Sequence, residues 1–206
     1  MDGIIFDVDG TLWDSTETVA KAWTQAIRDA SDLDMIVDGP LLSGLFGKTM
    51  DEICAALFPS LPVEERYRIG ELCFQYENDL LETELGALYD GVEETLRKLS
   101  EKYPLYIVSN CQCGYIEVML RSTGLGKYVK DTLCFGQTQT PKGQTIRTLM
   151  ERNGLKDVVY VGDTQGDADA CKEAGVPFVF AGYGFGDVPE ASQRIDSISQ
   201  LCEKYL

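Results

Sequence analysis

The chain has 206 residues, of which 44% are hydrophobic and 25% charged, enough to bury one substantial core and, at most, a small second lobe. With 18 basic against 34 acidic residues it carries a formal charge of −16, so we expect neither nucleic acid nor a membrane surface as a partner. The chain contains no histidine, which excludes Ser-His-Asp and Cys-His catalysis, His-ligated zinc and phosphohistidine chemistry.

The first part of the chain is predicted to form one strand followed by helices. Apolar residues 3–6 lead into the acidic and turn residues 7–11, a pattern typical of a buried parallel strand that opens into a loop. Apolar residues then recur every three or four positions over 15–30, which predicts an amphipathic helix. Two further helices are predicted, over 49–57 and 63–81.

After Gly86 the pattern alternates between strands and helices. Strands are predicted at 105–108, 132–135, 158–161 and 177–180, and helices at 92–102, 115–123, 142–153, 167–174 and 197–205. This alternation predicts an α/β fold with a doubly wound parallel sheet, which binds ligands at the carboxyl ends of its strands. We expect residues 1–14 and 87–206 to form this core, and residues 15–86 to form a helical insert over the strand ends, with hinges near 14–16 and 86–91.

The cysteines and the hydropathy pattern indicate in which cellular compartment we expect the protein. Seven cysteines are scattered through the chain without a cationic, apolar leader before them, so we expect buried or partly buried thiols in a reducing, cytoplasmic setting. Cys111 and Cys113 form a single pair with no second pair, which is a poor zinc site. No apolar run approaches the ~20 residues that a membrane span requires.

Polar side chains cluster where the predicted strands end or where the next helix begins. These positions are Asp7 with Asp9, Ser109 with Asn110, Lys142, and Asp163 with Asp167. In a doubly wound sheet they converge on one crevice. Several ionised carboxylates cannot share a site without a cation, and hard oxygen ligands favour Mg²⁺ over Zn²⁺. The sequence therefore predicts a magnesium site.

These residues resemble the four motifs of the haloacid dehalogenase superfamily of aspartate-nucleophile phosphatases and mutases. The motifs are Asp7-Val8-Asp9-Gly10-Thr11, Ser109-Asn110, Lys142 and Gly162-Asp163-Thr164-Gln165-Gly166-Asp167, in the order of the superfamily. The helical insert resembles its C1 cap, and residues 12–15 resemble the flap that leads into that cap. The resemblance implies a Rossmann-like core with an α-helical cap.

The resemblance also implies a role for each residue. Asp7 would attack phosphorus and form an aspartyl phosphate, while Asp9 would protonate the leaving alkoxide and then activate water. Ser109 and Asn110 would donate hydrogen bonds to the phosphoryl oxygens, and Lys142 would neutralise the charge that phosphate shares with the nucleophile.

The remaining motif residues would serve the metal. Mg²⁺ would be held by Asp163, by the carboxylate of Asp7 and by the backbone carbonyl of Asp9. Asp167 would orient a metal-bound water or Lys142 from the second shell, and the Thr11 hydroxyl would brace the loop.

Within the superfamily, Asp9 argues against a dehalogenase, because a departing halide needs no proton. Mutases similar to β-phosphoglucomutase carry a lysine and an arginine in the cap where this chain has Phe46 and Met50; Lys48 remains a candidate for substrate contact. We therefore expect a Mg²⁺-dependent phosphatase for a small phosphorylated metabolite, similar to phosphoglycolate phosphatase. A phosphosugar mutase and a non-catalytic binding protein are the alternatives, and we expect a monomer or weak homodimer. The sequence leaves the natural substrate open.

Two glycine-rich segments do not fit nucleotide-binding motifs. Gly47-Lys48-Thr49 lacks the earlier glycine of a P-loop and follows no predicted strand. The segment 182–186 fails the dinucleotide-binding spacing, so we expect it to be a flexible loop.

Overall fold

A computed structural model describes all 206 residues and has a six-stranded parallel sheet at its centre. The strand order is β5-β4-β1-β6-β7-β8. The strands are β1 (Gly3–Phe6), β4 (Leu105–Ser109), β5 (Val129–Cys134), β6 (Val158–Gly162), β7 (Phe178–Ala181) and β8 (Arg194–Ile195). The predicted α/β fold with a parallel sheet is confirmed, and the N-terminal strand β1 lies inside the sheet between β4 and β6.

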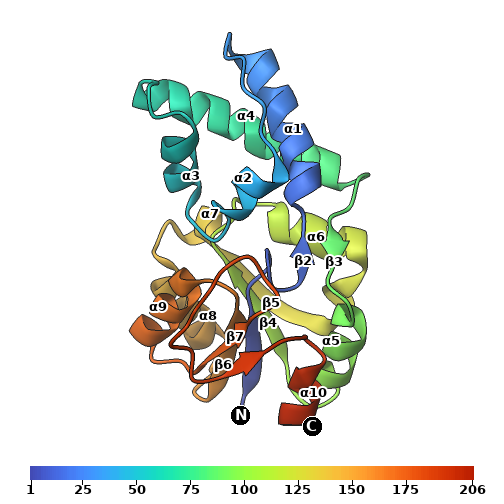
Figure 1. Cartoon of the computed structure of the whole chain (residues 1–206). Helices are drawn as coiled ribbons and strands as arrows, with labels where there is room; N and C mark the ends of the chain where they lie inside the picture. The colour runs from blue at the N-terminus through green and yellow to red at the C-terminus, as the bar shows by residue number, and fades with distance from the viewer.

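Helices cover both faces of the sheet (Figure 1). They are α5 (Val92–Ser100), α6 (Tyr115–Thr123), α7 (Phe135–Thr138), α8 (Lys142–Asn153), α9 (Gln165–Ala174), α10 (Gln200–Tyr205) and the 3₁₀ helix η1 (Leu125–Tyr128). Because successive side chains of a strand point to opposite faces, Ile5 packs with buried residues of α8 and α9, whereas Ile4 and Phe6 pack on the side of α5, α6 and α10. Burial on both faces explains the uninterrupted apolar run of β1.

The helical insert lies above the carboxyl ends of the strands (Figure 1). It contains α1 (Thr16–Ala30), α2 (Gly39–Ser43), α3 (Met50–Leu57) and α4 (Val63–Leu81), and α1 packs along α4. Two short antiparallel strands, β2 (Trp13–Asp14) and β3 (Ala87–Leu88), pair where the chain enters and leaves the insert. The insert is therefore tied to the sheet through two adjacent segments.

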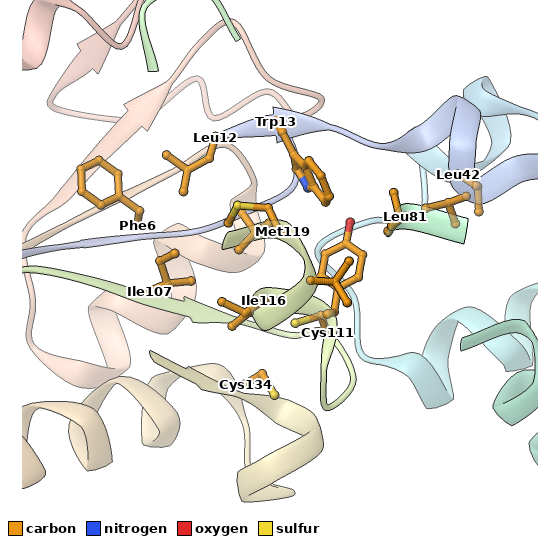
Figure 2. Close-up of a cluster of buried hydrophobic side chains, with 14 of the residues drawn as sticks. Phe6, Leu12, Trp13, Leu42, Leu81, Ile107, Cys111, Ile116, Met119 and Cys134 are labelled. Atoms are coloured by element: carbon orange, nitrogen blue, oxygen red, sulfur yellow. The ribbon is translucent and has the colours of Figure 1, made fainter. Parts of the chain in front are cut away.

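One cluster of buried apolar side chains continues from the sheet into the insert. Figure 2 shows Phe6 and Ile107 of the sheet at one end of this cluster, Trp13 between, and Leu42 and Leu81 of the insert at the other end. Hydrophobic burial thus holds the insert against the edge of the sheet where the polar motifs lie.

Several boundaries differ from the predicted ones for a physical reason. The strand predicted at 132–135 begins at Val129 and ends at Cys134, since β5 is an edge strand whose polar first half, Lys130 and Asp131, masks its pattern. The last helix begins at Gln200 rather than at 197. The short elements α2, β2, β3 and β8 were not predicted, because they have too few residues to show a period.

The cysteines are all free thiols, and five of them are buried. Cys113 is exposed, which departs from the expected burial, because it lies in the turn between β4 and α6. None of the helices combines the length and apolar composition needed to cross a membrane.

The burial of β1 leads to a first prediction. Ile5 is fully buried, whereas Ile36 keeps 69% of its surface exposed. We expect Ile5→Ala to lower the free energy of unfolding by about 2–5 kcal/mol, because it removes buried methyl groups and leaves a cavity. The same substitution at Ile36 is the control and should change it by less than about 0.5 kcal/mol. Urea denaturation measures both, and equal effects would contradict this packing.

Candidate active site

The loop after β1 brings two aspartates to the centre of the sheet edge. The backbone N–H of Asp7 donates to the carbonyl of Val161 at 2.9 Å, so this residue still follows the strand direction. Gly10 then turns the chain with a φ of +76°, and a Cβ there would lie 2.1 Å from Asp163 Oδ2. Only glycine allows this turn so close to the carboxylate.

Three carboxylates meet at this edge. Asp7, Asp163 and Asp167 each offer an oxygen within 4.8 Å of the others, and all three side chains are buried. Lys142, the first residue of α8, places its Nζ 3.0 Å from Asp7 Oδ1 and 2.6 Å from Asp167 Oδ1. The cluster therefore holds more negative than positive charge.

Burial and this excess of negative charge shift the pKa values of these groups. Burial, reinforced by the charge of Asp167, raises the pKa of Asp7 well above its usual value, and the same two causes raise the pKa of Asp163 to about 7. Burial alone would lower the pKa of Lys142, but Asp167 and Asp7 outweigh it and raise that pKa. The ammonium is thus charged, and the carboxylates lack a further cation.

Asp167 is held by its own helix terminus as well as by Lys142. Its Oδ2 accepts from the backbone N–H and the hydroxyl of Thr164, at 3.0 and 2.7 Å, in the capping box that begins α9 (Gln165–Ala174). Its Oδ1 accepts from Lys142 and, at 3.3 Å, from the Tyr160 hydroxyl. Both oxygens are therefore occupied by protein donors.

Asp163 is braced from two sides. The Thr11 hydroxyl donates to its Oδ1 at 3.3 Å, and the Phe185 backbone N–H donates to its Oδ2 at 2.8 Å. The interpretation of 182–186 as a flexible loop is corrected here, because Gly184 packs so closely that a Cβ on it would lie 2.2 Å from the Gly10 carbonyl. This segment is a wall of the site.

Asp9 points away from the carboxylate cluster, into a polar network of its own. Its Oδ1 accepts from Tyr115 Oη at 2.5 Å, Ser15 Oγ at 3.1 Å and Trp13 Nε1 at 3.2 Å, while Oδ2 has no hydrogen bond within the protein. Burial raises the pKa of Asp9 to about 6, although the three donors oppose the shift. One oxygen is fixed and the other is free to carry a proton.

Ser109 is the last residue of β4 and Asn110 follows it, and both line one cavity with Asp9. Ser109 is buried, and Asn110 Nδ2 donates to the Gly47 carbonyl of the insert at 2.8 Å. The Asn110 Oδ1 atom is buried without a partner. The second motif thus contacts the insert directly.

A small cavity of about 30 Å³ lies between these residues and the insert. Its lining residues come from the loop after β1, from the end of β4 and α6, and from the insert: Asp9, Ser109, Asn110, Cys111, Gln112, Tyr115, Trp23, Phe46, Gly47, Lys48, Met50, Ile53 and Glu77. Lys48 is exposed, so it lies at the mouth of this cavity.

Five of these lining residues are not candidates from the sequence: Trp23, Ile53, Glu77, Gln112 and Tyr115. Glu77 left a readable signal, because it follows the buried Ile69 and Cys73 and precedes Leu81 at spacings of four along α4. A glutamate within the apolar stripe of a helix indicates a buried carboxyl. Tyr115 left no such signal, since 106 residues separate it from Asp9.

Comparison with known proteins agrees with the motifs. Residues 4–181 match the family described as haloacid dehalogenase-like hydrolase. A phosphoglycolate phosphatase of Vibrio parahaemolyticus is 29% identical, covering 97% of this chain and 94% of the relative.

Solved structures share the fold. A haloacid dehalogenase-like family protein from Streptococcus pneumoniae has a TM-score of 0.85 at 19% identity, covering 100% of this chain and 99% of its own. A protein from Haemophilus somnus, described as a predicted phosphoglycolate phosphatase, has a TM-score of 0.83 at 23% identity. The match covers 100% of this chain and 98% of that protein. Since the family match spans most of its length, the chain belongs to the haloacid dehalogenase-like hydrolase family, as an enzyme of its phosphatase type.

Proposed function

We propose that this phosphatase is Mg²⁺-dependent and hydrolyses a small phosphorylated metabolite through an aspartyl phosphate on Asp7. The observation that carries the proposal is the buried cluster of Asp7, Asp163 and Asp167 around one lysine, beside an Asp9 with a free oxygen. The relatives' name makes phosphoglycolate the first substrate to test.

The donor set fits a hard divalent cation. The oxygens of the buried cluster exceed what Lys142 can neutralise, and Mg²⁺ takes few carboxylates beside water and phosphate. Asp7, Asp163 and the backbone carbonyl of Asp9 would hold it. Asp167 would instead position Lys142, because protein donors occupy both of its oxygens. When bound, Mg²⁺ supplies positive charge for the phosphoryl group and its nucleophile.

In the first step an Asp7 oxygen bonds to phosphorus while the bond from phosphorus to the ester oxygen breaks. Asp9 Oδ2 gives its proton to the departing oxygen, so an alcohol leaves. Lys142 and the Ser109 hydroxyl would hold the phosphoryl oxygens. Asn110 joins them, since Nδ2 carries a second hydrogen beyond the one that Gly47 accepts.

In the second step Asp9 takes a proton from water. The water oxygen bonds to phosphorus, the bond to Asp7 breaks, and phosphate leaves with the nucleophile restored. The three donors on Asp9 Oδ1 keep its other oxygen aimed into the cavity for both proton transfers.

We further propose that residues 15–86 act as a cap on a core of residues 1–14 and 87–206. The contact of Asn110 with Gly47 and that of Gln112 with Glu77 support this division, because they close the cavity from the insert's side. Hinges at 14–16 and 86–91 would adjoin the β2–β3 pair. Closure excludes water from the first step.

The cap residues favour hydrolysis over a mutase reaction. Phe46 packs edge-to-face on Phe185, and Met50 is buried, so neither position offers a cation to a second phosphate. Lys48, exposed at the cavity mouth, is the insert residue that we propose contacts the incoming anion. Seven free thiols support a cytoplasmic location, where we propose the enzyme works as a monomer or weak homodimer.

Asp7→Asn tests the nucleophile. The amide has almost the same shape but is a poor nucleophile and metal ligand, so we expect kcat/KM to fall about a thousandfold or more. Folding should survive, because Lys142 keeps Asp167 as a partner. Phosphate release and circular dichroism measure the two effects. Asp34→Asn, on an exposed loop, is the control and should have full activity; comparable activity in both variants would refute the assignment.

Asp9→Asn tests whether Asp9 is the group that protonates the leaving oxygen. The leaving group of ethyl phosphate is an alkoxide, which needs the proton. The leaving group of p-nitrophenyl phosphate, p-nitrophenolate, departs without it. We therefore expect the first-step rate with ethyl phosphate to fall about tenfold or more beyond the fall with p-nitrophenyl phosphate. Rapid-quench measurement of the first turnover reports both rates. Equal losses would show that Asp9 is not the acid.

Removal of the metal tests the carboxylate cluster. EDTA should abolish activity and added Mg²⁺ should restore it, while Ca²⁺ should inhibit, because its larger and more flexible shell can occupy both oxygens of Asp7. Mg²⁺ should also raise the Tm of the wild type, since binding to the native state stabilises it. That rise should shrink in Asp163→Asn. Undiminished activity in excess EDTA would contradict metal dependence.

A further inference from the structure

The cavity has a buried carboxyl group on its insert side. Glu77, on α4 of the insert, is only 3% exposed and lines the cavity that Asp9, Ser109 and Asn110 line on the core side. A substrate whose ester oxygen lies at Asp9 would extend its leaving group into this cavity, between the core and Glu77. The proposed reaction gives Glu77 no part.

The hydrogen bonds of Glu77 are incomplete in either protonation state. Trp23 Nε1 donates to Oε2 at 2.6 Å, and Gln112 Nε2 donates to Oε1 at 3.1 Å. No lysine or arginine pairs with the carboxyl, and burial raises its pKa to about 8. An ionised carboxylate would lack a counter-charge here, while a protonated one would lack an acceptor for its O–H, because both neighbours only donate.

The polar side chains next to Glu77 in the cavity wall are already engaged. Tyr115 Oη contacts Asp9 and Ser15, and the Gln112 amide is shared between Glu77 and Asn78. Beside these engaged groups Glu77 keeps capacity for a ligand, whereas the free atoms of Asp9 and Asn110 on the core side are assigned to the ester oxygen and the phosphoryl group in the proposed mechanism. A hydroxyl group both accepts and donates a hydrogen bond, so it complements the carboxyl in either state.

We infer that Glu77 is a specificity-determining residue that binds a hydroxyl of the leaving group, so the enzyme prefers phosphate esters of small polyols to esters that carry a carboxylate. The inference rests on the proposed function and adds the substrate class to it. A carboxylate in the leaving group would bring a further buried acid beside Glu77 with no buried cation to balance it, so its ionised form is costly there. Lys48 is the one cation of the lining, and its side chain is exposed to solvent.

An ammonium group fits less well than a hydroxyl. It would require an ionised Glu77 and a buried ion pair, and the desolvation of both charges offsets their attraction. A hydroxyl needs no change of charge in the cavity. The test must nevertheless compare both.

The wild-type enzyme supplies the first experiment, with four esters of nearly equal length. 2-Hydroxyethyl phosphate, phosphoglycolate, ethyl phosphate and phosphoethanolamine differ only at the end that faces Glu77. We expect kcat/KM for the hydroxyl ester to exceed each of the others by about tenfold or more. Glycerol 3-phosphate and 3-phosphoglycerate repeat the comparison of hydroxyl with carboxylate in a longer leaving group.

Glu77→Gln supplies the second experiment. The amide keeps the shape of the side chain, removes the negative charge and adds a donor that suits a carboxylate. We expect the ratio of kcat/KM for 2-hydroxyethyl phosphate to that for phosphoglycolate to fall about fivefold or more, with an absolute gain for phosphoglycolate. Glu71→Gln makes the same change on the exposed side of α4 and should leave the ratio unaltered.

Three results would overturn the inference. The first is a wild-type enzyme that prefers phosphoglycolate or phosphoethanolamine. The second is a wild-type enzyme that hydrolyses p-nitrophenyl phosphate but none of the alkyl esters. The third is a Glu77→Gln variant in which kcat/KM changes by the same factor for every ester. The last result would assign Glu77 to the contact between insert and core alone. A wild type inactive on p-nitrophenyl phosphate with Mg²⁺ would refute the proposed phosphatase mechanism itself, which separates the two failures.

Discussion

Three buried carboxylates share the carboxyl end of the sheet with one ammonium group, and the rest of the site depends on this imbalance of charge. Lys142 lies between Asp7 and Asp167, and burial together with the remaining negative charge raises the pKa of Asp7 and Asp163. Unpaired charges are costly to bury, so such a cluster persists where a cation and an anionic ligand complete it. The negative charge of the whole chain increases the need for that local cation.

The sheet makes the cluster possible. β1, β4 and β6 are adjacent and parallel, so the residues that follow them converge although they are far apart along the chain. Close backbone packing then fixes them, since Gly10 and Gly184 both approach Asp163 more closely than a side chain would permit. The strands and glycines therefore position carboxylates that would otherwise repel one another.

The insert completes the site from the opposite side. It contacts the second motif through Gly47, and Glu77 lines the cavity from the insert. In the proposed mechanism the core residues act on the phosphoryl group, which every candidate substrate shares, so the core is suited to the reaction rather than to the choice of substrate. Selectivity must then come from side chains that face the leaving group. The polar groups there are the Glu77 carboxyl and the Trp23 and Gln112 donors that it already binds, and no buried cation is among them. If Glu77 has the role that we propose, this chemistry would distinguish the chain from a strict phosphoglycolate phosphatase.

The sequence by itself determined the parallel α/β fold, the place of the helical insert and the motif residues, because each of these leaves a local pattern: buried strands end in polar turns, and helices repeat every three or four residues. Only the tertiary structure decided that Tyr115 contacts Asp9, that segment 182–186 packs against Asp163, and that Glu77 lines the cavity. These contacts join residues from different elements, and no period along the chain encodes the distance between two side chains. The predicted start of the edge strand β5, residue 132, is too late for a related reason, since its pairing with β4 compensates for a polar sequence at Lys130 and Asp131.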